Sequence, residues 1–397
     1  MKDSVSVVGL GYVGLPLAMA AAKSGYKVTG IDLDEIKVSE INRGISQIED
    51  IDNAELVDLV KTGKIKAESN YTSIENADIV AICVPTPLLE NKLPDLSYLE
   101  SAARSIKGKL TEKSLVILES TVAPGTTREF LAPLLQFDFN WPEKNFKLAF
   151  SPERIDPMNL KWKIKNTPKV VAGLTSEAKN LAIDFYSRFI DEVIGCDSIE
   201  VAETAKLLEN SFRFINISFI NELSIFCQKL GININDVIKT AATKPYGFMP
   251  FYPSIGVGGH CIPVDPIYLA TAAKILGAPT RFIDLAEQIN EEIPGYFVGR
   301  AEEKLGELKN KKILVVGVAY KPNVADMRES PAKLLIAGLK QKGALVTWHD
   351  DLVKEWNGEK SVDLSSDFDL AIIATPHDNL DLTKLDGMPV LDTRGSI

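Results

Sequence analysis

The loop that spans residues 256–266 contains the residues of this sequence that most clearly could take part in a chemical reaction. Its order, GVGGHCIPVDP, places glycines just before Cys261 and a helical pattern just after it. A thiol near a helix N-terminus has a lowered pKa and can act as a nucleophile. Both residues also have a purely structural interpretation. A cysteine such as Cys261 often serves as a small buried apolar residue, and an aspartate before a proline, as Asp265 is before Pro266, often serves as a helix N-cap. The local sequence leaves both interpretations open.

Four further polar residues stand where they could act on a bound substrate. Lys206 and Asn210 are four apart in a long helical pattern, so they share one face, although most such pairs lie on a solvated surface. Thr121 and Glu153 each end a predicted strand, and the carboxyl ends of strands are where open α/β sheets place ligands. Otherwise Thr121 would be a turn residue, and Glu153 would form a surface ion pair with Arg154.

A glycine motif near the N-terminus indicates a dinucleotide site. Gly9, Gly11 and Gly14 fit the pattern GxGxxG between a strand and a helix, where the helix N-terminus offers free N–H groups to a pyrophosphate. Asp32 follows 18 residues after Gly14, at the end of the second strand. A carboxylate there can accept hydrogen bonds from a ribose and would repel a 2′-phosphate, which favours NAD over NADP. The alternative is a glycine turn with an incidental aspartate.

The surrounding elements must position these residues, and the first half of the chain predicts a sheet. Buried strand patterns occur at 5–9, 27–32, 77–84, 114–121, 146–152 and 168–174. Helical stretches lie between several of them. This alternation predicts an NAD-binding, doubly wound Rossmann domain over residues 1–196.

The pattern changes after residue 196. One long helical pattern runs from residue 197 to about residue 231, and strand formers are sparse as far as residue 300. Residues 197–300 are therefore predicted as a helical central domain that carries the cysteine loop. Strand patterns return at 311–320, 344–350, 370–376 and 389–394. They predict a second, smaller Rossmann-like domain over 301–397. The predicted fold class is α/β: two Rossmann-like doubly wound domains joined by an all-helical middle domain with a long central helix.

The amino-acid composition and net charge exclude several classes of protein. The 397 residues are 45% hydrophobic and 25% charged, which is typical of a globular protein and argues against disorder. The net charge, 44 − 54 = −10, argues against nucleic acid as a general partner. We expect no membrane partner, because no apolar run approaches about 20 residues. We expect no signal peptide either, because Met1 to Ser4 lead straight into an apolar strand pattern without a cleavage site. Four scattered cysteines and three histidines favour a reduced, cytoplasmic setting without a metal site.

Six motifs together resemble the UDP-glucose/GDP-mannose dehydrogenase family, and they occur in that family's order. They are GLGYVGLP (9–16), STVAPGTT (120–127), SPERIDP (151–157), AKLLEN (205–210), GVGGHCIPVDP (256–266) and AYKPNVADMRESPA (319–332). The resemblance covers nearly the whole chain. It implies NAD as the cofactor and a UDP-sugar as the substrate, bound by the domain at 301–397. It also implies that 197–300 is the dimerisation domain, with a homodimer or dimer of dimers formed through the helix at 197–230.

The resemblance also implies roles for single residues, with no metal ligand among them. Cofactor-binding roles fall on Gly9, Gly11, Tyr12, Val13, Gly14, Asp32, Thr86 and Thr121. Substrate-binding roles fall on Glu153, Arg154, Lys206, Asn210, Tyr246, Phe248, Tyr252, Gly258, Lys321 and Arg328. Catalytic roles fall on Cys261, Lys206, Asp265 and Glu153, with Thr121 and Asn210 positioning the water and the oxyanion.

The reaction that the resemblance implies is oxidation of a sugar C6 alcohol to a carboxylate in four electrons, with two NAD⁺ used in turn. Lys206 would stabilise the alkoxide and Asp265 would take its proton. Cys261 would hold the aldehyde as a thiohemiacetal and then as a thioester. Glu153 or Asp265 would activate the water that hydrolyses the thioester.

Two stretches resemble the UDP-N-acetylhexosamine branch of the family. They are GGHCIPVDP and KPYGFMPFYP (244–253), and they favour UDP-N-acetylglucosamine over UDP-N-acetylmannosamine, with UDP-glucose third. Ile255, Met158 and Ala325 depart from the family's usual residues beside the substrate loops. The products of such enzymes serve polysaccharide biosynthesis. Two other classes stay open: a two-electron hydroxyacid dehydrogenase, which needs neither Cys261 nor a second nucleotide domain, and a non-catalytic nucleotide-binding protein.

Overall fold

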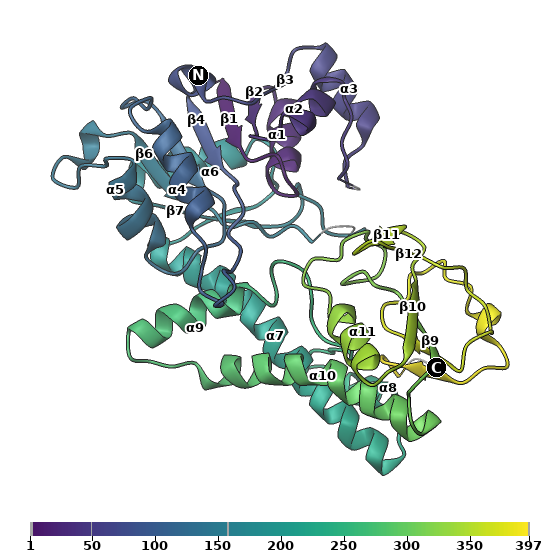
Figure 1. Ribbon diagram of the computed structural model, residues 1–397. Coiled ribbons are helices and arrows are strands. Elements are labelled where there is room, and N and C mark those ends of the chain that lie inside the picture. The colour runs from purple at the N-terminus through teal and green to yellow at the C-terminus, as the bar shows by residue number, and fades with distance from the viewer. Residues whose placement is uncertain (1–2, 49, 157–158, 396–397) are drawn as a thin grey trace. The chain divides into compact units, whose positions relative to one another are not determined.

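The computed structural model describes residues 3–48, 50–156 and 159–395 (Figure 1). The chain divides into two compact units, residues 1–208 and residues 209–397. Met158 and Pro157, the last residue of the SPERIDP motif, lie outside the described residues. In the described part of the chain, every helix is too short or too polar to cross a membrane.

The first unit is built on one eight-stranded sheet with the order β3-β2-β1-β4-β5-β6-β7-β8. The strands are β1 (Ser4–Val8), β2 (Lys27–Ile31), β3 (Ile65–Glu68), β4 (Ile79–Ile82), β5 (Leu115–Leu118), β6 (Lys147–Phe150), β7 (Lys169–Gly173) and β8 (Val193–Gly195). β1 to β6 run parallel, and β7 and β8 run antiparallel to them. The carboxyl ends of β1, β2, β4, β5 and β6 therefore meet at one edge of this sheet.

Helices cover both faces of that sheet, because its central strands are buried on both sides. One core packs β-strand side chains such as Val7 and Ile117 against α1 (Gly14–Lys23), α3 (Asn53–Lys61) and α6 (Ser176–Tyr186). The other packs the alternate side chains, such as Val116, against further helices. Those are α4 (Ser97–Ile106) and α5 (Ala132–Leu134), while α2 (Glu35–Asn42) contacts β3 near the sheet edge.

The second unit combines helices with a four-stranded parallel sheet of order β10-β9-β13-β14. The strands are β9 (Lys312–Val316), β10 (Leu345–His349), β13 (Leu370–Ile373) and β14 (Val390–Asp392), with a separate hairpin of β11 (Glu355–Trp356) and β12 (Glu359–Lys360). The helices are α7 (Ile199–Leu230), which begins in the first unit, α8 (Ile234–Ala241), α9 (Asp265–Ile275), α10 (Arg281–Leu305) and α11 (Ala332–Gln341). α10 and α11 cover one face of the sheet.

The predicted fold class is confirmed, since the structure has Rossmann-like sheets of mostly parallel strands and a helical middle region with the long helix α7. The sequence analysis missed β3 and β8. Both are the edge strands of the large sheet, where one side stays open to solvent and a buried apolar run is not required. The boundaries 1–196, 197–300 and 301–397 stay a prediction.

Candidate active site

The glycine turn after β1 has the shape that a pyrophosphate requires. Gly9 has a φ of +92°, and its N–H donates to the carbonyl of Ile31 at 2.7 Å. A Cβ on Gly14 would lie 1.8 Å from the carbonyl oxygen of Gly9, so α1 packs directly on the turn. A Cβ on Gly11 would meet nothing within 4 Å. The turn therefore leaves an open cradle at Gly11, in front of the N-terminus of α1, and this cradle fits NAD.

Asp32 lies beside this turn, at the carboxyl end of β2. Its carboxylate accepts hydrogen bonds from Leu10 N at 3.0 Å, from Asp34 N at 3.1 Å and from Lys37 Nζ at 2.9 Å. Burial acts to raise the pKa of Asp32, but the hydrogen bonds from Lys37, Leu10 and Asp34 outweigh it and hold the pKa below its ordinary value. Asp32 is thus a fixed anion, as the interaction with a ribose and the exclusion of a 2′-phosphate both require.

Two alanine substitutions in the turn should have opposite phenotypes. We expect Gly14→Ala to lower the free energy of unfolding by about 1–3 kcal/mol or more, because its Cβ would overlap backbone. We expect Gly11→Ala to melt like the wild type but to raise the dissociation constant for NAD about tenfold or more, because its methyl group would enter the cradle. Thermal melting and NAD titration measure the two effects. Wild-type NAD affinity in Gly11→Ala would contradict the placement of the pyrophosphate.

Thr86 and Thr121 lie together at the carboxyl ends of β4 and β5. The hydroxyl of Thr86 donates to the carbonyl of Thr121 at 2.8 Å. Nearby, the hydroxyl of Ser120 donates to the carbonyl of Val84 at 2.6 Å. These bonds join the two loops that leave neighbouring strands, so the two predicted cofactor contacts share one site at the edge of the sheet.

Glu153 follows β6 and is held at both carboxylate oxygens. Oε1 accepts the N–H groups of Arg154 at 2.6 Å and Ile155 at 2.5 Å, and Oε2 lies 3.2 Å from Lys169 Nζ. Arg154 in turn donates from a guanidinium NH group to the carbonyl of Pro168 at 3.1 Å. Since each oxygen has a donor, Glu153 has one fixed orientation at the same sheet edge.

The sequence analysis missed the buried groups behind Glu153. Lys169 also contacts Glu119 at 2.5 Å, and the hydroxyl of Tyr186 donates to the other oxygen of Glu119. Burial raises the pKa of Glu119, although the charge of Lys169 acts to lower it. Burial acts to lower the pKa of Lys169, but the carboxylates of Glu119 and Glu153 have the larger effect and raise that pKa. The sequence did offer a signal for these two residues, because Glu119 and Lys169 are charged residues within runs that read as buried strands.

Lys206 lies on α7, where Glu203 anchors the loop after β5. Lys206 is buried, with 9% of its surface exposed. Glu203 precedes it by three residues and accepts hydrogen bonds from Gly125 N at 2.6 Å, Thr127 N at 2.9 Å and Thr127 Oγ1 at 2.6 Å. Burial raises the pKa of Glu203 to about 7, against these hydrogen bonds. Glu203 was missed, although its spacing from Lys206 places both on one helical face.

In the second unit, the glycines before Cys261 serve close backbone packing. A Cβ on Gly258 would lie 2.6 Å from the carbonyl oxygen of Glu329. Gly259 has a φ of +82°, and its N–H donates to the carbonyl of Arg328 at 3.0 Å. The cysteine loop is thus seated on the loop that follows β9, and Cys261 itself is only partly buried. A partly exposed thiol on a braced loop suits a nucleophile better than a packing residue.

Asp265 is the first residue of α9 and is 3% exposed. Asn210, on α7, donates from Nδ2 to its Oδ2 at 2.5 Å. The N-cap position of α9 belongs to Val264, so the interpretation of Asp265 as an N-cap is not supported. The structure instead brings Asn210 and Asp265 together, and Asp265 lies four residues after Cys261.

The predicted UDP contacts divide into two groups in the second unit. Lys321 and Arg328 follow β9, and Arg328 forms an ion pair with Asp326 at 2.6 Å. Burial acts to raise the pKa of Asp326, but the bonds from Arg328 outweigh it and lower that pKa. The second group lies on an exposed loop: Tyr246, Phe248 and Tyr252 are 73%, 39% and 56% exposed.

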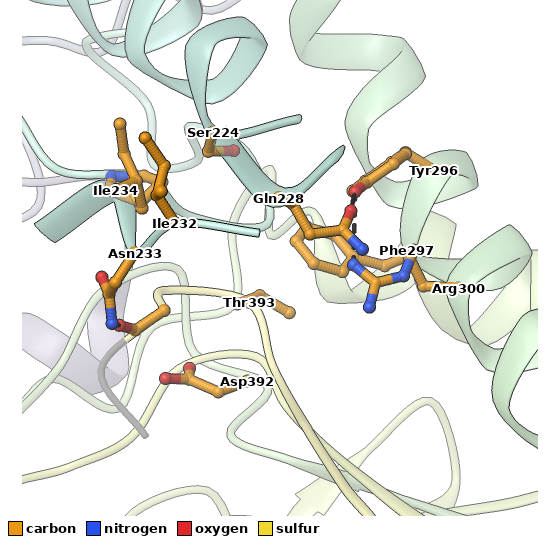
Figure 2. A pocket seen from close by; sticks show the side chains of 12 residues that line it. Ser224, Gln228, Ile232, Asn233, Ile234, Tyr296, Phe297, Arg300, Asp392 and Thr393 are labelled. Carbon is orange, nitrogen blue, oxygen red and sulfur yellow. Dashed lines mark hydrogen bonds between the residues drawn. The ribbon is translucent and has the colours of Figure 1, made fainter. Parts of the chain in front are cut away.

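An open hollow in the second unit is lined by none of the predicted site residues. Figure 2 shows Gln228 from α7 and Tyr296 and Arg300 from α10 on one side of it, with Asp392 and Thr393 on the other. The hydroxyl of Tyr296 donates to the side-chain oxygen of Gln228 at its rim.

Comparison with known proteins identifies each part of the chain. The UDP-glucose/GDP-mannose dehydrogenase family matches with its NAD binding domain over residues 3–190, its central domain over 200–292 and its UDP binding domain over 314–397. A UDP-N-acetyl-D-mannosamine dehydrogenase of Methanococcus maripaludis is 34% identical, over 96% of this chain and 88% of that protein. A UDP-N-acetyl-D-glucosamine 6-dehydrogenase of Pseudomonas aeruginosa is 35% identical, over 89% and 84%. The solved UDP-D-ManNAc dehydrogenase of Pyrococcus horikoshii superposes with a TM-score of 0.90 at 30% identity, covering 99% and 100%.

Proposed function

Because the chain belongs to the UDP-glucose/GDP-mannose dehydrogenase family and has its NAD binding and UDP binding domains, we propose that it oxidises the C6 alcohol of a UDP-N-acetylhexosamine to the uronate. One observation supports the four-electron reaction most directly. The buried carboxylate of Asp265, bonded to Asn210 at 2.5 Å, stands four residues after the partly exposed Cys261. A thiol and a carboxylate on one loop are what a covalent aldehyde intermediate needs.

The residues divide the reaction between them. Bound NAD⁺ accepts a hydride in each of the two oxidations. Lys206 stabilises the alkoxide as the C6 hydroxyl loses its proton, and Asp265 receives that proton directly or through water. The Cys261 thiolate adds to the aldehyde carbon, and the oxygen of the thiohemiacetal takes up a proton. After the second oxidation, water adds to the thioester carbon and the thiolate leaves.

Glu153 and Asp265 are the two candidates for the base that takes a proton from that water. The contacts of Glu153 fix the orientation of its carboxyl group at the sheet edge, since Lys169 and two N–H groups hold its oxygens. Thr121 and Asn210 position the water and the oxyanion. Asn210 uses its Nδ2 on Asp265, so it also orients that carboxylate.

UDP-N-acetylglucosamine is the favoured substrate, on the basis of the stretch KPYGFMPFYP and a relative of that name. UDP-N-acetylmannosamine is the second candidate, because relatives of that name have nearly the same identity. Lys321 and Arg328 bind the diphosphate in this proposal, with contacts to UDP or to a partner subunit from Phe248 and Tyr252.

Counting NADH against consumed sugar tests the reaction. We expect two NADH per sugar with UDP-N-acetylglucosamine or UDP-N-acetylmannosamine, and slower turnover with UDP-glucose, because four electrons leave C6 and each NAD⁺ accepts two. A panel of these three UDP-sugars with purified protein, followed at the NADH absorbance and by mass of the product, measures both. One NADH per sugar would indicate a two-electron dehydrogenase, and no NADH with any of them would exclude the proposed reaction.

The proposal includes a homodimer that packs through α7. Phe212, Phe219, Phe226 and Leu230 are spaced seven, seven and four residues apart, so they form one stripe along the helix, and they are 45–60% exposed. An apolar stripe of this length fits a second copy of itself. We expect Phe219→Asp to shift the protein from dimer to monomer in sedimentation velocity. A monomeric wild type would contradict the proposal.

A further inference from the structure

Three loops meet at the carboxyl edge of the sheet in the second unit, and the buried residue His377 lies between them. They follow β10, β9 and β13, which are neighbours in the sheet. Their contact is close: Gly317 has a φ of +85°, and a Cβ there would lie 1.9 Å from the carbonyl oxygen of Thr375. The motif that includes Lys321 is part of the loop after β9.

The carboxylate of Asp350, just after β10, accepts hydrogen bonds from its own loop and from the loop after β9. Its Oδ2 accepts Val318 N at 2.8 Å and Ala319 N at 3.2 Å. Its Oδ1 accepts the N–H groups of Leu352 and Val353, both at 2.9 Å, and lies 2.9 Å from His377 Nε2. Burial acts to raise the pKa of Asp350, but the bonds from His377 and from these N–H groups outweigh it and bring the pKa to about 2. Asp350 is therefore a buried, fully bonded anion.

The other nitrogen of His377 faces the loop of Lys321. Its Nδ1 accepts the N–H of Asn323 at 2.8 Å. A nitrogen that accepts this bond has no proton, so Nε2 bears the proton and donates it to Asp350. The imidazole is thus in one neutral tautomer. Its Nδ1 is bonded to the loop after β9, and its Nε2 is bonded to the loop after β10.

Asn323 is the turn residue that this arrangement holds. It has a φ of +64°, in the left-handed region that few residues other than glycine adopt readily. Its side chain forms a pair of hydrogen bonds with Asp378, from Nδ2 to Oδ2 at 2.8 Å and from Asp378 N to Oδ1 at 3.1 Å. Two consecutive residues after β13, His377 and Asp378, therefore fix the turn that begins at Lys321.

We propose that His377 is a positioning residue of the UDP site: it joins the carboxyl ends of β10 and β13 to the turn at 321–323 and so places Lys321 for the diphosphate. This inference rests on the proposed function, which assigns Lys321 to UDP. His377 does not touch the substrate in this view. Its two hydrogen bonds set the position of the turn, and the turn sets the position of the cation.

Two substitutions separate the two nitrogens of His377. His377→Asn keeps an acceptor near the position of Nδ1 and loses the donor to Asp350. His377→Gln keeps a donor near the position of Nε2 and loses the acceptor for Asn323 N. We expect His377→Gln to raise the calorimetric dissociation constant for UDP about tenfold, and His377→Asn to stay within about threefold of the wild type, as one hydrogen bond would predict. In steady-state assays the KM for the UDP-sugar should follow the dissociation constant, with kcat within about twofold and the KM for NAD unchanged.

An exposed residue supplies a second pair of variants that does not disturb the core. Asp378→Ala and Asp378→Asn both remove one negative charge, but only Asp378→Asn keeps an acceptor for Asn323 Nδ2. Charge alone would tighten the binding of a diphosphate in both. We expect Asp378→Ala to bind UDP about threefold more weakly than Asp378→Asn.

The outcomes distinguish this inference from the proposed function. If the wild type binds UDP while both members of each pair bind it equally, the positioning role is wrong and the function stands. If the wild type fails to bind UDP, the proposed function falls and this inference falls with it. Weaker binding by His377→Gln and Asp378→Ala, relative to their partners, supports the inference.

Discussion

Cys261→Ser should stop the reaction at the aldehyde, after one hydride transfer instead of two. A serine hydroxyl is a much weaker nucleophile than a thiolate, so the aldehyde would not be held for the second oxidation. We expect the yield of uronate to fall by about a thousandfold or more, the order found when an enzyme loses its nucleophile. A single-turnover assay with excess enzyme should give one NADH per sugar. Borodeuteride should reduce the aldehyde to a C6 alcohol that carries one deuterium, which mass spectrometry distinguishes from unreacted substrate.

Cys196→Ser is the matched control, because Cys196 is also partly buried but lies outside the cysteine loop. It should retain wild-type turnover and the full NADH yield. Normal amounts of uronate from Cys261→Ala would show that no covalent bond to this residue is needed. In that case the two oxidations would pass through a free or hydrated aldehyde.

Lys206→Met should suppress even the first oxidation. The ammonium group of this buried lysine is proposed to stabilise the alkoxide, and methionine keeps most of the side-chain volume without the charge. Removal of one group that stabilises an oxyanion costs about 10²–10³ in kcat, so we expect a loss of that size or larger. The burst of NADH in a single turnover should disappear, whereas in Cys261→Ser it should remain.

Lys229→Ala provides the control on the same helix, since Lys229 is an exposed lysine near the end of α7. It should leave kcat and both KM values within about twofold of the wild type, as is usual for surface substitutions. If Lys206→Met gave one NADH per sugar at the wild-type rate, Lys206 would have no part in the first step. The assignment of the alkoxide contact would then have to change.

Short-range features of the site could be predicted because their physical cause is local. Gly9 and Gly14 are required by backbone sterics within one turn, and the close contact between them follows from the GxGxxG spacing alone. The same holds for Cys261 and Asp265, which the chain places four residues apart at the start of α9. The long α7 also follows from its own helical pattern, without reference to its neighbours.

Groups whose partners are distant in the chain could not be predicted. Glu119 and Lys169 are 50 residues apart, and Glu203 reaches Gly125 across 78 residues. Each looks like an ordinary charged residue until the sheet and α7 bring the partners together. The edge strands β3 and β8 were missed for a related reason, because their pairing with a neighbour defines them and their composition does not.

The order of the motifs thus establishes which chemical groups this enzyme has at its disposal: a thiol, an ammonium group, two carboxylates and a glycine turn for a dinucleotide. Folding settles how each group is oriented and whether it holds a charge. Burial removes water from Glu119, Glu203 and Asp350, and hydrogen bonds from remote segments replace that water in one fixed geometry. Those bonds depend on which strands and loops become neighbours, and no short stretch of residues contains that information.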